Sequence, residues 1–353
     1  MTPIAHLIGS VPLKSADEVF RKVSQSIGQH VKRMPDGETG RRSDWIGFVR
    51  RHLGKNPAFE RDESVPWFQF KQWDGKVIRE WPLLKIINGT DHSSIQLETG
   101  YAEDAITSFS QFEVLQTEGI IPQTVKYQAC SATPHAISYM YITPEDQAAF
   151  TDIYTAHLID EVREISGSIP HHKLAYQWDV CQEVLMWEGY FKSYQGYKDD
   201  IIRTLTKVGD AVVGSIDMGY HLCYGSPLDE HCVQPKDIGN LVEMANKLTA
   251  AVSRRIDYIH MPVPKDRNDE AYFAPLADLE LSADTDLYLG CVHHNDHEGN
   301  ARKLDLARQQ TDIAGVGSEC GWGRGDPENL NSILDAHNII LNSGSKTTIQ
   351  NSN

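Results

Sequence analysis

The sequence predicts an α/β protein built as a single (β/α)8 TIM barrel, and three observations lead to this fold. The chain has 353 residues, of which 40% are hydrophobic, and no shift in composition divides it into two globular halves. Short apolar or β-branched runs alternate with amphipathic stretches, as expected of βα units around a buried parallel sheet. The runs number eight, the strand count that closes such a sheet into a barrel.

The expected strands follow one another along the chain. Each is a short run rich in Val, Ile, Leu or Tyr that ends in polar or turn-forming residues, as buried strands do. In chain order they cover residues 5–11, 31–35, 125–130, 174–179, 212–220, 256–260, 287–292 and 313–317.

The first expected helix lies between the first two strands. Ser15 and Glu18 have the spacing of a capping box. Val19, Val23 and Ile27 then recur at helical spacing before a glycine. This pattern predicts a helix with one buried face.

Further helices are indicated by proline and acidic residues at their starts. Thr143 and Asp326 each precede a proline, a pattern that predicts a capping residue followed by the first helical position. Residues 235–252 carry Ile, Leu, Val and Ala along one stripe and predict a helix that faces the core.

The regular alternation is interrupted at about residues 55–89, a segment rich in tryptophan and phenylalanine. We expect an insertion after the second strand and helix unit, as a surface hairpin whose aromatic side chains pack on the barrel, with a lid as the alternative. The barrel then spans residues 1–343, and the polar segment 344–353 is expected to be a disordered tail.

Composition excludes several classes of function. The formal net charge of −16 repels phosphate backbones and anionic lipids, so we expect neither nucleic acid nor membrane as a partner. The beginning of the chain has no signal-peptide pattern, and no apolar run approaches the length of a membrane span. The six dispersed cysteines suit free thiols or metal ligands. A cytoplasmic protein that acts on a small molecule is expected, and homo-oligomeric assembly is left open.

The strongest chemical pattern is the pair His221 and Cys223 at the end of the fifth expected strand. Residues two apart on a strand share a face, so both side chains can bind one ion. His260 and Cys320 fall at the ends of the sixth and eighth strands, which meet at the active face of a barrel. Nitrogen and sulfur ligands favour Zn²⁺.

Other interpretations of these residues stay open. A lone H-x-C pattern fits a core strand as well as a metal site, and His231 with Cys232 would close a purely structural site. Asp36, Glu38 and Asp179 could form the paired carboxylates of a glycosidase. A non-enzymatic protein is a further alternative, either a barrel that keeps zinc only for stability or a degenerate binding protein.

The sequence resembles the catalytic barrel of cobalamin-independent methionine synthase, within the superfamily that includes uroporphyrinogen decarboxylase. The family's H-x-C-Y segment and its late Cys-Gly are matched by His221 to Tyr224 and by Cys320 with Gly321. Further similar segments, in chain order, are Ile8-Gly9-Ser10, Gly37-Glu38 with Arg41 or Arg42 and Asp44, Gln177-Trp178-Asp179, and Gly290-Cys291-Val292-His293. Together they extend from residue 8 to residue 324.

The resemblance implies a role for each matched residue. His221, Cys223 and Cys320 would bind zinc, with His260 at the position of another ligand. His293 or its neighbour His294 would be the catalytic histidine, and Asp179 would act beside the reacting groups. The residues expected to bind substrate are Ser10, Glu38, Asp179, Trp178 and Tyr224.

Two departures from the family pattern affect the expected chemistry. The family's zinc-binding glutamate is replaced by His260, which would either bind the ion or lie behind the ligands and leave one coordination position open. Residues 180–183 read V-C-Q-E where the family has E-P-A after its aspartate, so we expect no dependence on folate.

The sequence therefore predicts a zinc-dependent transferase that activates a thiol, such as that of homocysteine or another amino acid, for methyl or alkyl transfer. The alternative is a zinc-dependent lyase or hydrolase that acts on a small metabolite in the same site.

Overall fold

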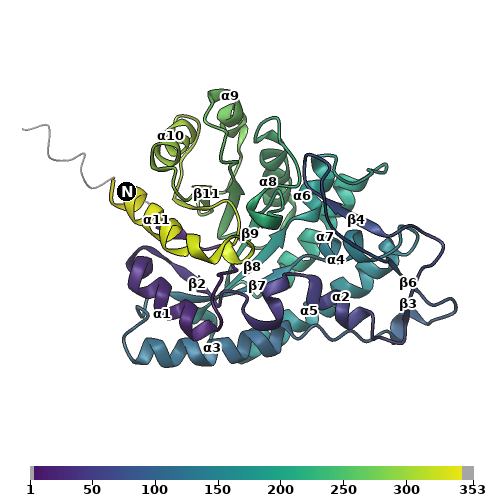
Figure 1. Cartoon of the computed structure of the whole chain (residues 1–353). Coiled ribbons are helices and arrows are strands. Elements are labelled where there is room, and N and C mark those ends of the chain that lie inside the picture. The colour runs from purple at the N-terminus through teal and green to yellow at the C-terminus, as the bar shows by residue number, and fades with distance from the viewer. Residues whose placement is uncertain (1–3, 344–353) are drawn as a thin grey trace, which may run out of the picture.

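The computed structural model describes residues 4–343, so the expected tail lies outside the described residues. All eight expected strands are present and parallel, and the predicted α/β barrel is confirmed (Figure 1). Their order is β1-β12-β11-β10-β9-β8-β7-β2, and a parallel bridge between Ala5 and Val31 joins the two ends. The strands are β1 (Ile4–His6), β2 (Arg33–Pro35), β7 (Lys126–Ala132), β8 (Leu174–Val180), β9 (Asp217–Leu222), β10 (Tyr258–Pro262), β11 (Asp286–Val292) and β12 (Gly315–Ser318).

Helices surround the strands and bury the core between the two layers. The α-helices are α1 (Ala16–Ile27), α2 (Gly47–Leu53), α3 (Tyr101–Thr117), α4 (Pro134–Tyr141), α5 (Gln147–Ser168), α6 (Gln182–Trp187), α7 (Tyr197–Ala211), α8 (Gly239–Ala251), α9 (Glu270–Phe273), α10 (His297–Arg308) and α11 (Leu330–Ser343). Short 3₁₀ turns complete the loops: η1 (Gly28–His30), η2 (Gly40–Asp44), η3 (His92–Ser94), η4 (His171–Lys173), η5 (Pro227–Asp229), η6 (Ala274–Asp278), η7 (Trp322–Arg324) and η8 (Pro327–Asn329). Within residues 4–343, no helix combines the length and apolar character that crossing a membrane requires.

Two of the three predicted capping residues lie at the start of a helix or a helical turn. At α1, the Ser15 side chain accepts a hydrogen bond from the Glu18 amide at 3.3 Å, as the capping box predicts. Asp326 likewise caps η8, which leads into α11. The predicted start at Thr143 is wrong, because α5 begins at Gln147. The Thr143 amide instead donates to the carbonyl of Leu84 and ties the insertion to the barrel.

The segment between α2 and α3 holds two small antiparallel sheets, which lie together on one side of the molecule, away from α10 and α11 (Figure 1). One pairs β3 (Phe59–Arg61) with β6 (Leu84–Ile86), and the other is a hairpin of β4 (Phe68–Lys71) and β5 (Val77–Trp81). Trp81 packs on Tyr141 of α4 and donates to the carbonyl of Met140 at 2.6 Å. Phe70, on the same hairpin, reaches over the barrel opening. The aromatic residues thus attach the insertion to the active face.

Candidate metal centre and carboxylate cavity

Two thiols and one imidazole meet at the C-terminal ends of the strands. Cys223 follows β9 and Cys320 follows β12, and their sulfur atoms lie 3.5 Å apart. His221, near the end of β9, shares the inward face with Cys223. The ligand atoms of these three residues all lie within 4.8 Å of one another, and all three side chains are buried. Strand alternation places the first pair, and barrel closure brings Cys320 to them.

The chemistry of this donor set fits zinc. Zinc prefers tetrahedral nitrogen and sulfur ligands with Zn–S bonds of about 2.3 Å, which corresponds to sulfur atoms about 3.8 Å apart. The Nδ1 atom of His221 is occupied by a hydrogen bond, whereas its Nε2 atom is buried without a hydrogen-bond partner among residues 4–343. Burial lowers the pKa of His221 to about 4, so the ring is neutral, as a ligand must be.

The thiols themselves are protonated when no cation is bound. Contact with Cys223, together with burial, raises the pKa of Cys320 to about 12. The neighbouring Cys181 thiol is the largest cause of the raised pKa of Cys223. A guanidinium nitrogen of Arg324 donates to the Cys320 sulfur at 3.4 Å and favours its thiolate. A metal cation would be the stronger source of positive charge here.

The metal centre borders a small cavity of about 70 Å³. Its walls include Ser10 after β1, Glu38 after β2 and Asp179 on β8, beside the three candidate ligands. Phe70 of the insertion and Trp45 also line it. Three of the five residues expected to bind substrate, Ser10, Glu38 and Asp179, are therefore brought together with the thiols.

Two buried carboxylates give this cavity its electrostatic character. Burial raises the pKa of both Glu38 and Asp179. The charge of Glu38 raises the pKa of Asp179 further, and that of Asp36 raises the pKa of Glu38. Arg324 lies 3.9 Å from Glu38, and Gln177 donates to Asp179 at 2.8 Å. Such a pair is suited to hold a positively charged group of a ligand, which would lower both pKa values.

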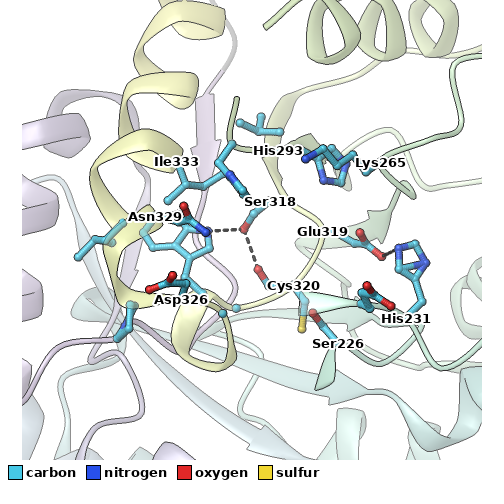
Figure 2. Close-up of a pocket in the computed structure, with 18 of the residues that line it drawn as sticks. Ser226, His231, Lys265, His293, Ser318, Glu319, Cys320, Asp326, Asn329 and Ile333 are labelled. Carbon is cyan, nitrogen blue, oxygen red and sulfur yellow. Dashed lines mark hydrogen bonds and ion pairs between the residues drawn. The ribbon is translucent and has the colours of Figure 1, made fainter. Parts of the chain in front are cut away.

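A larger pocket of about 420 Å³ opens on the other side of Cys320. Figure 2 shows His231 and Glu319 on one wall, where Nε2 of the ring lies 2.9 Å from a carboxylate oxygen, with Asp326 and Asn329 on the opposite wall. His293 lies at its upper edge (Figure 2). The Cys320 residue therefore lines both the inner cavity and this outer pocket.

The fold of this chain has similar solved structures, whereas its sequence has no match. No protein-family model and no curated protein matches the sequence. Among solved structures, a B12-independent methionine synthase from Shewanella sp. W3-18-1 in complex with selenomethionine matches with a TM-score of 0.63 and 14% identity, over 98% of each chain. A putative vitamin-B12-independent methionine synthase from Listeria monocytogenes matches with a TM-score of 0.55 and 12% identity, over 96% of this chain and 98% of that one. The chain has a methionine-synthase-like barrel fold.

Within this methionine-synthase-like barrel, the other residues expected in the site lie further away. His260 is not in the three-residue metal group, and its Nδ1 lies 2.8 Å from Nδ1 of His221. Trp178 points outward from β8 into the core, where its ring packs on Tyr176 at 4.9 Å. Tyr224 is buried, with its hydroxyl 3.3 Å from that of Tyr272. Neither Trp178 nor Tyr224 lines the inner cavity.

His293 also lies outside the inner cavity. It lines the outer pocket, its Nε2 donates to the carbonyl of Val263 at 2.9 Å, and burial lowers its pKa to about 3. His293 is thus a neutral ring in this structure.

The alternative local site is not formed among the described residues, because His231 pairs with Glu319 and the metal group contains neither His231 nor Cys232.

Sequence reasoning missed Arg324, Cys181, Trp45 and Phe70, which all line the inner cavity. Arg324 follows Cys320 by four residues in a glycine-rich turn, and this spacing was a usable signal. Cys181 follows Asp179 by two residues at the end of the same strand, so alternation places both side chains on one face. Phe70 comes from strand β4 of the insertion and Trp45 from the turn before α2, and neither approach to the site has a local sequence pattern.

Proposed function

We propose that this protein is a zinc-dependent, methionine-synthase-like transferase that activates the thiol of a small amino acid for methyl or alkyl transfer without folate. The observation that carries the proposal is the buried group of His221, Cys223 and Cys320, which lies between a carboxylate-lined cavity and a larger outer pocket. The barrel fold shared with methionine synthases supports it.

The chain's own residues divide the work in this proposal. His221, Cys223 and Cys320 would hold zinc, which supplies a Lewis acid that keeps a substrate thiol deprotonated at neutral pH. Glu38 and Asp179 would bind the substrate's ammonium group, since two buried carboxylates favour a cation.

The remaining residues of the cavity would orient the substrate and exclude water. Ser10 offers a hydroxyl next to the turn at Gly323, whose amide donates to it at 3.2 Å. Phe70 and Trp45 add apolar surface to the cavity wall, and a water-poor site would strengthen each polar contact inside it. The outer pocket offers the alkyl donor a place beside Cys320.

Metal analysis of the purified protein is the deciding experiment. We expect about one zinc per chain, retained in Cys232→Ser and lost or greatly reduced in Cys223→Ser and Cys320→Ser. Cys232 is the matched control, because it is buried in the same apolar cluster as the two ligands but does not belong to the metal group. A zinc-free wild-type protein, or unchanged zinc in both ligand variants, would refute the proposal.

A second measurement separates thiol transfer from the alternative zinc chemistry. Zinc-edge X-ray absorption should gain one sulfur neighbour when homocysteine is added to the zinc-loaded protein. If no sulfur is gained while a small ester or amide is hydrolysed, the protein is a hydrolase that uses the same ligands.

A further inference from the structure

The ring of His260 forms a hydrogen-bonded pair with the candidate ligand His221. The two residues are register partners on β10 and β9, and their Nδ1 atoms lie 2.8 Å apart. Both side chains are buried, with 0% and 2% of their surface exposed. One hydrogen bond between two nitrogen atoms needs one proton, so one Nδ1 carries it and the other accepts it.

The metal group determines which ring carries the proton. With Nδ1 of His221 engaged by His260, only Nε2 of His221 is free to bind a cation. A neutral imidazole that offers a lone pair at Nε2 has its proton on Nδ1. His221 therefore donates and His260 accepts, and the remaining proton of a neutral His260 lies on its own Nε2. The carbonyl of Ser318 is on that side of the ring, although Nε2 makes no hydrogen bond of standard geometry among residues 4–343.

Two glycines on the neighbouring strands make room for the His260 ring. A Cβ at Gly290 of β11 would lie 2.7 Å from Nε2 of His260 and 2.9 Å from the Ser318 carbonyl oxygen. A Cβ at Gly317 of β12 would lie 3.3 Å from the same Nε2. The His6 ring lies near the other side, with its centroid 5.7 Å away. The ring is therefore confined behind His221.

We propose that His260 is a positioning residue that accepts the Nδ1 proton of His221, holds that ring in the metal-binding tautomer, and leaves zinc with three protein ligands. The inference rests on the proposed zinc site. Metal-binding histidines usually donate their second nitrogen to a carboxylate or a carbonyl, and such partners affect metal affinity about 10- to 100-fold. Here a neutral ring takes that role, so the fourth coordination position stays open for the substrate thiol.

The wild-type protein gives the first test. Zinc-edge X-ray absorption resolves imidazole from sulfur neighbours, and we expect two sulfurs and one imidazole from the chain. Two imidazoles would make His260 a ligand and overturn the inference. In ¹⁵N spectra of histidine-labelled, zinc-loaded protein, His221 should be the Nδ1–H tautomer and His260 the Nε2–H tautomer. The reverse assignment would also overturn it.

Two variants then test the hydrogen bond. His260→Leu removes the acceptor and should weaken zinc binding about 10- to 100-fold in a chelator competition. His260→Gln offers a carbonyl oxygen as acceptor and should recover most of that loss. His337→Gln is the control, because His337 is equally buried but bonds within its own helix, to Ile333.

The outcomes separate the two proposals. A zinc-free wild type refutes the proposed function, whereas a zinc-loaded wild type whose affinity is the same in His260→Leu refutes only the role of His260. If His260→Leu fails to fold, as circular dichroism would reveal, the wild-type coordination number and tautomers still decide the question.

Discussion

The position of Glu38 depends on the absence of a side chain at Gly9. A Cβ at Gly9 would overlap the Oε1 atom of Glu38 and lie 3.3 Å from its carboxyl carbon. The backbone there has little freedom to shift, because the φ of Glu38 is 49° and that of Gly37 is 80°, both in the left-handed region, so the Glu38 side chain must move instead. Gly9→Ala should therefore push the carboxylate away from the cavity.

The two effects of Gly9→Ala differ in size. The overlapping atom is the end of a side chain, so the loss of stability should fall at the lower end of the ~1–3 kcal/mol typical of overpacking. The loss of binding should be larger. A hydrogen bond between an ammonium group and a carboxylate contributes about 1.5–3 kcal/mol, and about 1.4 kcal/mol is a tenfold change in affinity. We expect amino-acid binding to weaken roughly 10- to 100-fold.

Urea unfolding and calorimetric titration with the amino-acid thiol measure these effects separately, and zinc content should not change because Gly9 touches no candidate ligand. Gly167→Ala is the matched control, since a Cβ there would meet no heavy atom within 4 Å. Being inside α5, it should stabilise the protein by up to about 1 kcal/mol. Wild-type affinity in Gly9→Ala would show that Glu38 does not hold the substrate.

Three further predictions concern stability. Burial raises the pKa of Asp179, so the folded protein retains a proton that the unfolded chain releases. The free energy of unfolding therefore falls as pH rises from about 4 through the raised pKa, by up to about 1.4 kcal/mol per pH unit. Asp179→Asn should flatten this dependence in urea unfolding between about pH 5 and pH 8, and an unchanged slope would contradict the assignment. Burial opposes ionisation of Glu161, but hydrogen bonds from His157, Thr99 and the Ala102 amide outweigh it and lower its pKa to about 2. The stabilisation that ionised Glu161 gives the folded protein is therefore complete above about pH 4.5 and is lost as pH falls towards 2. Glu161→Gln should lower the free energy of unfolding by about 1–3 kcal/mol at neutral pH in the same assay, and this variant should lose little further stability in acid. Finally, zinc at about 100 times its Kd should stabilise the folded protein by about 2.7 kcal/mol, and equal melting temperatures with zinc and with EDTA would argue against a site specific to the folded state.

The barrel could be predicted because its signals are local. Each strand is a short apolar run, and the first helix is marked by its cap at Ser15 and by apolar residues at helical spacing. The exact ends depend on tertiary contacts instead. Thr143 has the sequence of a helix cap, yet its amide pairs with the insertion strand β6, and α5 starts at Gln147.

The residues of the inner cavity that the sequence did not predict also have a physical explanation. On β8, Gln177 and Asp179 face the barrel interior, so the intervening Trp178 must face the helices, and strand alternation alone could have removed it from the substrate-binding set. Phe70 and Trp45 could not have been found in this way. They reach the cavity because an insertion and a loop fold over the barrel opening, which no residue spacing encodes.

The replacement of the family's glutamate by His260 on β10 requires space on the neighbouring strands β11 and β12. In the family that the sequence resembles, a glutamate ends this strand and binds zinc. An imidazole at the same position is bulkier and is held back beside Gly290 and Gly317, where any larger side chain would meet it. With the ring behind His221, the proposed metal group would have one negative charge fewer than the family's and an open coordination position. Zinc with two thiolates and one neutral imidazole carries no net charge, and Arg324 adds a positive charge beside Cys320. An incoming thiol would therefore be deprotonated readily and bound as an anion, and its nucleophilicity would be lower than at a more negative site.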